Sequence, residues 1–201
     1  MSNAEATLPP LAPAGQGLPP VEAWVARHVL FPLATQQLTR SEAITKLLAK
    51  GQKALQLTQA LPVELAHQRQ LIPRFMGIED SSRYWSVAMT LKHLLITGEA
   101  MASLTECLAQ GQTSSLVVRI EDVKPDPTLD LAALMHDYSQ FLAGYEARMS
   151  QPTLTQWQRP KHQHPWFGEI NAHQWLCLNT LHHGIHLKQL HLISKALTHH
   201  A

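Results

Sequence analysis

The sequence lacks the features that mark several classes of protein. Its 201 residues include only two cysteines, Cys107 and Cys177, which form no C-x-x-C motif and are too few for a disulfide framework. We therefore expect buried free thiols in a reducing compartment, with the cytoplasm as the default location. The formal net charge is only +1, so the composition does not favour a nucleic-acid-binding surface.

Long hydrophobic runs are also missing. No segment reaches the roughly 18 consecutive apolar residues needed to span a bilayer. The N-terminus does not combine a basic start with an apolar stretch, so no secretory signal is expected. Apolar residues make up 45% and charged residues 15% of the chain, which fits a globular domain with one sizeable core. We expect no membrane partner.

Apolar residues at three- and four-residue spacing predict an all-α fold. Residues 1–19 are rich in Pro, Ala and Gly and should form a disordered or loosely attached tail, which leaves 20–201 as a single domain. A short helix is expected over 20–33, interrupted at its end by Pro32. The long helices are expected over 39–61, from Ser81 or Ser82 to about 110, over 130–149 and over 171–197.

Two longer connections complete this prediction. Residues 113–128 contain the only β-like run, Leu116 to Ile120, and one short strand cannot make a sheet, so we interpret the segment as a crossover along the helices. Residues 151–170 form a final loop of unusual length, which is often a sign of function. Four long amphipathic helices with one long crossover and an extra short N-terminal helix predict a four-helix bundle.

Histidine is the residue that is over-represented, with 13 copies crowded toward the C-terminus. His182 and His186 lie four residues apart on the last predicted helix, whose start carries a capping box of Asn171 and Gln174. An i, i+4 pair places both imidazoles on one helix face, where they can bind one metal ion. The residue after His182 is His183 rather than Glu, so the helix supplies no general base of the zincin type.

A third ligand must come from another helix, and His93 is the best candidate. It shares a helical face with Met89, Ile96 and Ala100, so its ring should point inward. Three neutral imidazoles leave coordination positions open, as expected of a catalytic rather than a structural site. Without such partners, inward histidines are more commonly satisfied by hydrogen bonds within the core.

Several neighbouring residues have two interpretations each. His183 faces about 100° away from His182 and is expected to be a packing or surface residue, but it is the chief alternative ligand. Gln189 is either a second-shell group that orients a ligand or a surface amide. His164 and Trp166 either line the mouth of the site or anchor the loop on the end of the bundle. Glu99 lies off the face of His93 and is at most a second-shell group.

In these motifs the chain resembles the DinB-like superfamily of metal-binding four-helix bundles. The resemblance rests on W-S-V-A-M-T-L-K-H-L, which contains His93, and on H-H-G-I-H-L-K-Q from His182 to Gln189. The segment H-P-W-F-G-E-I-N-A-H-Q-W, which begins at His164, resembles the entry to the last helix in one branch of the family. The resemblance covers roughly residues 38–197. Leu187 and Lys188 depart from the Arg that usually follows the last histidine.

The resemblance implies a three-histidine site for a divalent ion, Zn or Ni, formed by His93, His182 and His186. It implies a small-molecule substrate, a low-molecular-weight thiol as a further cofactor, and a homodimer, since dimers are common in the family. An enzyme of thiol S-transferase or hydrolase type is the first hypothesis. The second hypothesis is a non-catalytic, stress-related bundle whose core is stabilised by the ion. The third hypothesis is an interaction module without metal.

Overall fold

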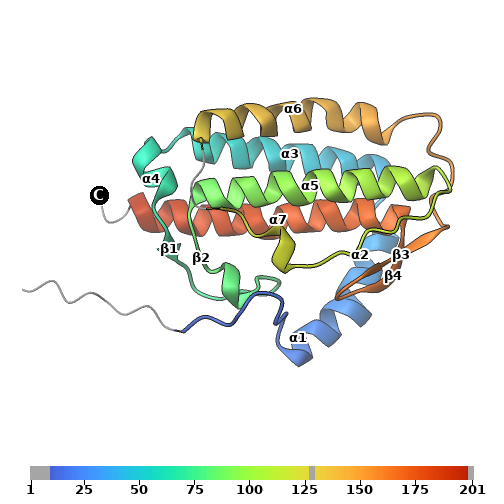
Figure 1. Ribbon diagram of the computed structural model, residues 1–201, viewed down its shortest axis with the longest axis horizontal. Coiled ribbons are helices and arrows are strands. Elements are labelled where there is room, and N and C mark those ends of the chain that lie inside the picture. Colours follow the sequence, from blue (N-terminus) through green and yellow to red (C-terminus); the bar gives the residue numbers. More distant parts are fainter. Residues whose placement is uncertain (1–9, 127–129, 199–201) are drawn as a thin grey trace, which may run out of the picture.

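The computed structural model describes residues 10–126 and 130–198, which are mostly helical (Figure 1). The helices are α1 (Pro20–Val25), the π-helical segment η1 (Ala26–Leu30), α2 (Phe31–Gln37), α3 (Arg40–Gln59), α4 (Val63–His67), α5 (Val87–Ala109), α6 (Leu131–Met149) and α7 (Ala172–Thr198), with short 3₁₀ turns η2 (Asp80–Ser82) and η3 (Glu121–Val123). Two small antiparallel sheets pair β1 (Gln70–Leu71) with β2 (Tyr84–Trp85), and β3 (Lys161–His164) with β4 (Gly168–Asn171). The prediction of an all-α fold is confirmed.

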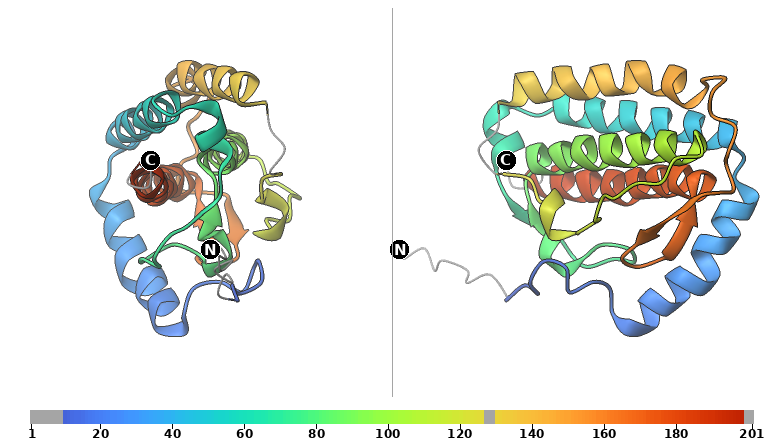
Figure 2. Two further views of the ribbon diagram at one scale, coloured as in Figure 1. Left: turned by 90° about the vertical axis from the view of Figure 1, so that its left-hand side faces the viewer. Right: turned by 45° about the vertical axis from the view of Figure 1, so that its right-hand side comes forward.

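Four long helices form the body of the molecule. α3 and α5 each pack against both α6 and α7, and the end-on view in Figure 2 shows the four lying side by side. Tyr138 and Tyr145 of α6 are among the largest fully buried side chains between them. The N-terminal helices, the β3–β4 hairpin and the segment between α5 and α6 all gather on the side of α5 and α7 that faces away from α6 (Figures 1 and 2). No helix in residues 10–126 or 130–198 is both long and apolar enough to cross a bilayer.

Capping residues determine where these helices begin. Thr39 forms a capping box with Glu42, and Asn171 forms one with Gln174, each through reciprocal side-chain and backbone hydrogen bonds. The start of α5 differs from the prediction, because Ser86 rather than Ser81 or Ser82 accepts the capping hydrogen bond. The residues before it are held in η2 and in the β1–β2 pair, which keeps them out of the helix.

The N-terminal helix runs past the proline that was expected to end it. Helical structure continues from Pro20 through the π-helical segment η1 and on to Gln37 of α2. Proline lacks an N–H and its ring crowds the carbonyl one turn earlier, so it normally breaks an α-helix. Here Pro32 is the second residue of α2, just after the wider turn of η1, and proline is tolerated in the first turn of an α-helix.

Residues 151–170 were expected to be a long loop, but they contain regular secondary structure. They include β3 and lead into β4, which pair from Lys161 with Asn171 to His164 with Gly168. Gly168 follows the turn with φ +74°, a conformation that side chains other than glycine rarely adopt. Phe167 of this turn stacks on Phe31 of α2 with ring centroids 4.3 Å apart. The hairpin is therefore packed against the N-terminal helices.

The segment before α1, expected to be a tail, contacts the loop that precedes α5. The Ala12 N–H donates to Asp80 at 2.8 Å, and the Gly17 N–H donates to Glu79 at 3.0 Å. Residues 1–9 lie outside the described part of the chain, as do 127–129 of the crossover and the terminal residues 199–201. The part of the crossover that is described contains η3 and no strand over 116–120.

Candidate metal centre

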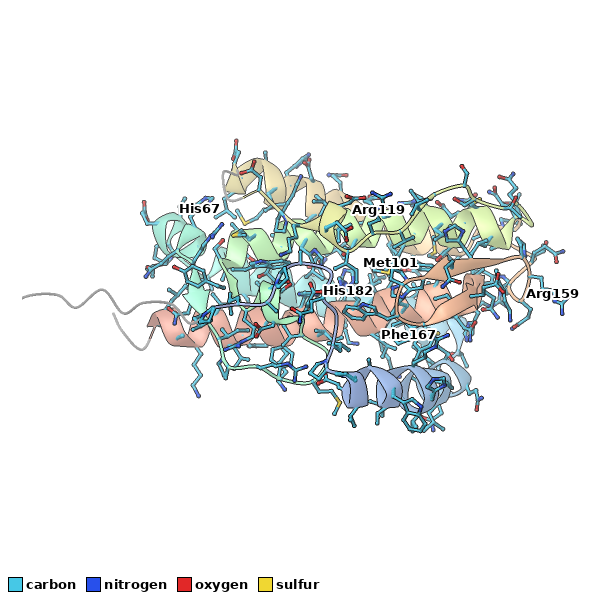
Figure 3. All side chains as sticks on the ribbon, turned by 60° about the horizontal axis from the view of Figure 1, so that its bottom comes forward. His67, Met101, Arg119, Arg159, Phe167 and His182 are labelled. Carbon is cyan, nitrogen blue, oxygen red and sulfur yellow. The ribbon has the colours of Figure 1, made fainter. Side chains whose placement is uncertain are left out.

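Three histidines from two helices meet at one point of the structure. The rings of His93 on α5 and of His182 and His186 on α7 have centroid separations of 4.4 to 5.0 Å. One nitrogen from each ring lies within 4.8 Å of the other two, and Nε2 of His93 is 3.2 Å from Nε2 of His182. Figure 3 shows His182 midway along α7. The sequence-predicted residues are thus brought together as a group that can hold a metal ion.

The orientation of His93 is set by the crossover. Its Nδ1 lies 2.8 Å from the Val123 carbonyl oxygen, which can only accept a hydrogen bond. In the neutral ring Nδ1 therefore carries the proton, and Nε2 is left with a bare lone pair. A residue about thirty positions away in sequence thus decides which nitrogen of His93 faces the cluster.

His182 is oriented in the same sense by Thr97. The Thr97 hydroxyl donates its only hydrogen to the backbone oxygen of His93 at 2.7 Å, so toward Nδ1 of His182 it can act only as an acceptor. That second contact is long, at 3.5 Å. It assigns the proton to Nδ1 of His182 and again leaves Nε2 bare.

His186 is oriented by Gln189, which lies one turn further along α7 and is fully buried. The Gln189 amide nitrogen donates to the Ser82 carbonyl at 2.7 Å, which points its oxygen at Nδ1 of His186, 2.6 Å away. Nδ1 of His186 is therefore a donor, and Nε2 is free to bind. Of the two interpretations of Gln189, the structure agrees with a group that orients a histidine, because the amide is not on the surface.

This hydrogen-bond pattern suits a cation at the centre. Nε2 of His93 and Nε2 of His182 are both acceptors, so their 3.2 Å contact cannot be a hydrogen bond between neutral rings. Zn–N bonds of about 2.0–2.1 Å at a tetrahedral angle would place two ligand nitrogens about 3.3 Å apart. The observed spacing fits a shared divalent ion.

Burial keeps the three rings in the neutral form that a metal requires. Loss of solvation lowers the pKa of His93 to about 4, although the hydrogen bond to Val123 acts in the opposite direction. Burial and the neighbouring imidazoles lower the pKa of His182 and His186 as well. Trp85 packs on the cluster, edge-on to His93 and parallel to the ring of His186. His182 alone keeps part of its surface exposed, so the open side of the cluster lies there.

His183, the alternative ligand, lies on another side of α7. It is 1% exposed, its Nδ1 donates to the Asn179 carbonyl one turn earlier, and its ring lies roughly parallel to those of Tyr138 and Phe141, with centroids 6.4 and 6.2 Å away. Its Nε2 is buried without a hydrogen-bond partner among the described residues. It is a packing residue and does not join the three-histidine group.

The other candidates divide between the hairpin and the surface of α5. Nδ1 of His164 accepts the N–H groups of Trp166 and Phe167, so this histidine anchors the hairpin turn. Burial lowers its pKa to about 4, and its ring is near enough to His182 to affect the charge there. Trp166 lines a neighbouring pocket. Glu99 forms an ion pair with Arg148 at 2.6 Å and orients none of the three histidines.

Sequence reasoning missed the acceptors that orient the rings. Thr97 lies one turn after His93 and could have been noticed from its spacing, since it falls on the same helical face. The Val123 and Ser82 carbonyls have no such signal, because a backbone oxygen is present at every position. Only the folded arrangement identifies them.

Comparison with protein-family models, with curated proteins and with solved structures found no match to this chain. The functional conclusion therefore depends on the geometry and chemistry of the three-histidine group.

Proposed function

We propose that this protein binds one divalent metal ion, Zn or Ni, through Nε2 of His93, His182 and His186. The observation that carries the proposal is that all three rings use Nδ1 for a hydrogen bond and turn a bare Nε2 toward the same point. Second-shell acceptors of this kind are what fix tautomer and orientation in histidine metal sites.

We propose further that the bound ion is catalytic, in a thiol S-transferase or a hydrolase. Three protein ligands leave at least one coordination position for another molecule, and the partial exposure of His182 supports access to it. A divalent ion at this position would lower the pKa of a thiol or water beside it and so supply a nucleophile at neutral pH.

The chain's own contribution would be to hold the ligands in place and to exclude water. Among the described residues no carboxylate belongs to the metal-binding group. A thiol needs less help than water to ionise near neutral pH, which favours a low-molecular-weight thiol as cosubstrate over hydrolysis. A small electrophilic molecule would then be the second substrate.

The arrangement of α3, α5, α6 and α7 supports the same assignment. We propose that they form a four-helix bundle of the DinB-like type, with residues 112–130 as its long crossover. The two ligand-bearing helices, α5 and α7, pack directly against each other, as metal sites between facing helices require. A homodimer and a cytoplasmic location belong to this proposal.

A non-catalytic bundle stabilised by its ion is the second candidate. It is favoured by the position of the histidines at the junction of the crossover, the η2 loop and α7, because an ion there would fasten three segments together. The two candidates differ in whether a small molecule reaches the ion.

The test has two parts that answer separate questions. Protein purified without a nickel column should contain close to one Zn or Ni per chain by inductively coupled plasma mass spectrometry. A screen of thiols with electrophilic substrates should then show turnover that a chelator abolishes and added metal restores. Metal-free protein that takes up no Zn or Ni would refute the site, whereas bound metal without any turnover would favour the structural role.

A further inference from the structure

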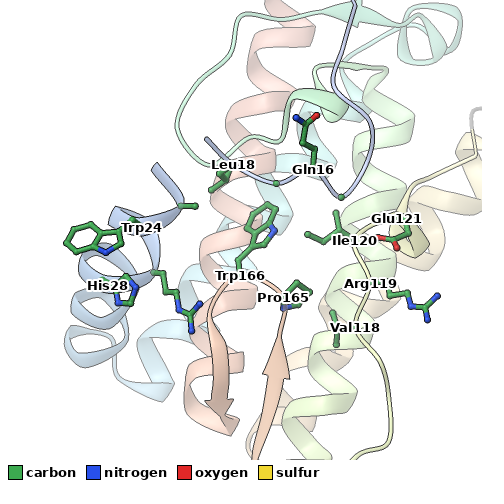
Figure 4. A pocket seen from close by; sticks show the side chains of 14 residues that line it. Gln16, Leu18, Trp24, His28, Val118, Arg119, Ile120, Glu121, Pro165 and Trp166 are labelled. Atoms are coloured by element: carbon green, nitrogen blue, oxygen red, sulfur yellow. The ribbon is translucent and has the colours of Figure 1, made fainter. Parts of the chain in front are cut away.

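The structure also contains a pocket of about 560 Å³, which we call the side pocket. Its walls come from four segments that are far apart in sequence, namely residues 15–18, 23–28, 118–121 and 165–166 (Figure 4). The volume is within the range of roughly 300–1,000 Å³ typical of small-molecule sites. None of the three cluster histidines lines it.

Two of these walls nonetheless connect to segments that orient the cluster histidines. The wall at 118–121 continues to Val123, whose carbonyl orients His93. The wall at 15–18 is tied through Gly17 to Glu79, in the loop whose Ser82 carbonyl holds Gln189. A molecule in the side pocket would therefore touch segments that position the cluster.

Arg27 gives the side pocket a cation without a partner. The ion pairs of the described residues involve Arg74, Arg83 and Arg148, and no carboxylate there pairs with Arg27. Its guanidinium lies over Gly168, with one nitrogen only 2.9 Å from where a Cβ at that position would be. The missing side chain of Gly168 thus leaves room for this guanidinium between η1 and the hairpin. An unpaired guanidinium readily binds a carboxylate, sulfonate or phosphate oxygen pair.

The rest of the wall combines apolar side chains, including Trp166 and Ile120, with polar ones. Figure 4 shows Trp166 and Ile120 pointing toward one another across the pocket, while Arg119 points to the other side of the crossover. Glu121 lies against Gly15 on the wall formed by the crossover and the N-terminal segment. An aromatic ring provides a stacking surface for a planar group, and a carboxylate on the wall disfavours a second negative charge.

We propose that the side pocket binds a small organic monoanion, with its anionic group on Arg27 and a flat apolar part against Trp166. The identification of this ligand as the remote portion of the substrate rests on the proposed function. Binding remote parts of a substrate supplies free energy that positions the reacting part. The binding of the anion itself does not depend on the metal.

The probe is 2-naphthoate, followed by titration calorimetry and by the fluorescence of the tryptophans, with neutral 2-naphthol as the uncharged analogue. Saturable binding of one naphthoate per chain is expected, at least about tenfold tighter than naphthol, because only the anion pairs with Arg27. Arg27→Ala should weaken naphthoate about tenfold or more and leave naphthol nearly unchanged, whereas Arg27→Lys should retain part of the affinity. Arg119→Ala is the charge-matched control: Arg119 also borders the pocket, but its exposed side chain is directed away from Trp166 (Figure 4), so its loss should change the affinity less than about twofold.

Glu121→Gln sharpens the test, because removal of a nearby negative charge should tighten naphthoate slightly and not naphthol. Equal affinities for naphthoate and naphthol, or an Arg27→Ala variant that binds naphthoate as the wild type does, would overturn the proposal. The His186→Ala variant separates the two hypotheses, because it should lose metal and still bind naphthoate. Loss of naphthoate binding in that variant would show that the anion binds at the metal instead of at Arg27.

Discussion

His182 and His183 are neighbours in the chain, yet they lie in two different environments. The ring of His182 meets His93 and His186 at the edge of the α5–α7 interface, while that of His183 is enclosed by Tyr138 and Phe141 in the core. Both rings are withdrawn from water enough to lower their pKa. Burial alone therefore does not make a metal ligand.

The difference lies in what the two ring nitrogens face. At His182 the Nδ1 atom has an acceptor and Nε2 points at two other bare nitrogens. At His183 the Nδ1 atom also has an acceptor, the Asn179 carbonyl, but Nε2 faces no polar partner among the described residues. Convergence of bare nitrogens, and not the presence of histidine, distinguishes the candidate metal centre from the core.

Removal of one proposed ligand should have the largest effect on the difference between the two histidines. His186→Ala leaves two imidazoles, which should not retain a divalent ion through purification, so the metal content should fall from near one per chain to near zero. Inductively coupled plasma mass spectrometry measures this directly. His191→Ala, at an exposed position on the same helix, is the control and should keep its metal. An unchanged metal content in His186→Ala would show that the ion is bound elsewhere.

His183→Ala should lower the free energy of unfolding and leave the metal content unchanged. Truncation to alanine opens a cavity between α6 and α7, and large-to-small core substitutions of this kind cost about 2–4 kcal/mol. Chemical denaturation of the metal-free protein gives the free energy of unfolding, for which the exposed His136→Ala should lie within about 0.5 kcal/mol of wild type. If the folded His183→Ala protein lost its metal, the division between the two histidines would be wrong.

The same comparison shows how far sequence can predict this molecule. The i, i+4 spacing of His182 and His186 and the capping box at Asn171 are local patterns, and the structure contains both. His183 could be assigned only to packing or surface, since the helical period gives its direction but not what lies there. The hairpin at 161–171 was missed because its pairing depends on packing against the N-terminal helices.

The tautomers could not be predicted because their determinants are distant in sequence or carry no signature. Val123 reaches His93 across 30 positions, and Ser82 reaches Gln189 across 107. Thr97 is the exception, since it shares a helical face with His93. What sequence supplies is a set of candidate ligands, and the hydrogen bonds that select among their protonation states require the fold.

Substitutions of Gln189 test whether the hydrogen bond to Nδ1 of His186 contributes to metal affinity. Gln189→Leu removes the acceptor for Nδ1 of His186 and should weaken the metal by about 10–100-fold, the usual cost of losing such a partner. Gln189→Glu keeps an acceptor at that place, although it loses the donor to Ser82, and should retain most of the affinity. Competition with a metal-binding dye measures both. Equal weakening in the two variants would mean that the acceptor does not orient His186.

The smallest expected effect is the contribution of His183 to the pH dependence of the free energy of unfolding. Burial is the main cause that lowers its pKa to about 4, so between about pH 6.5 and 4 the unfolded chain takes up a proton there that the folded chain does not. That difference lowers the free energy of unfolding as pH falls, by at most about 1.4 kcal/mol per pH unit. His183→Leu removes this contribution, so the stability of the metal-free wild type relative to the variant should decline from pH 7 to pH 5 in urea titrations. A difference that stays constant over this range would mean that the buried ring of His183 is not kept neutral by the fold.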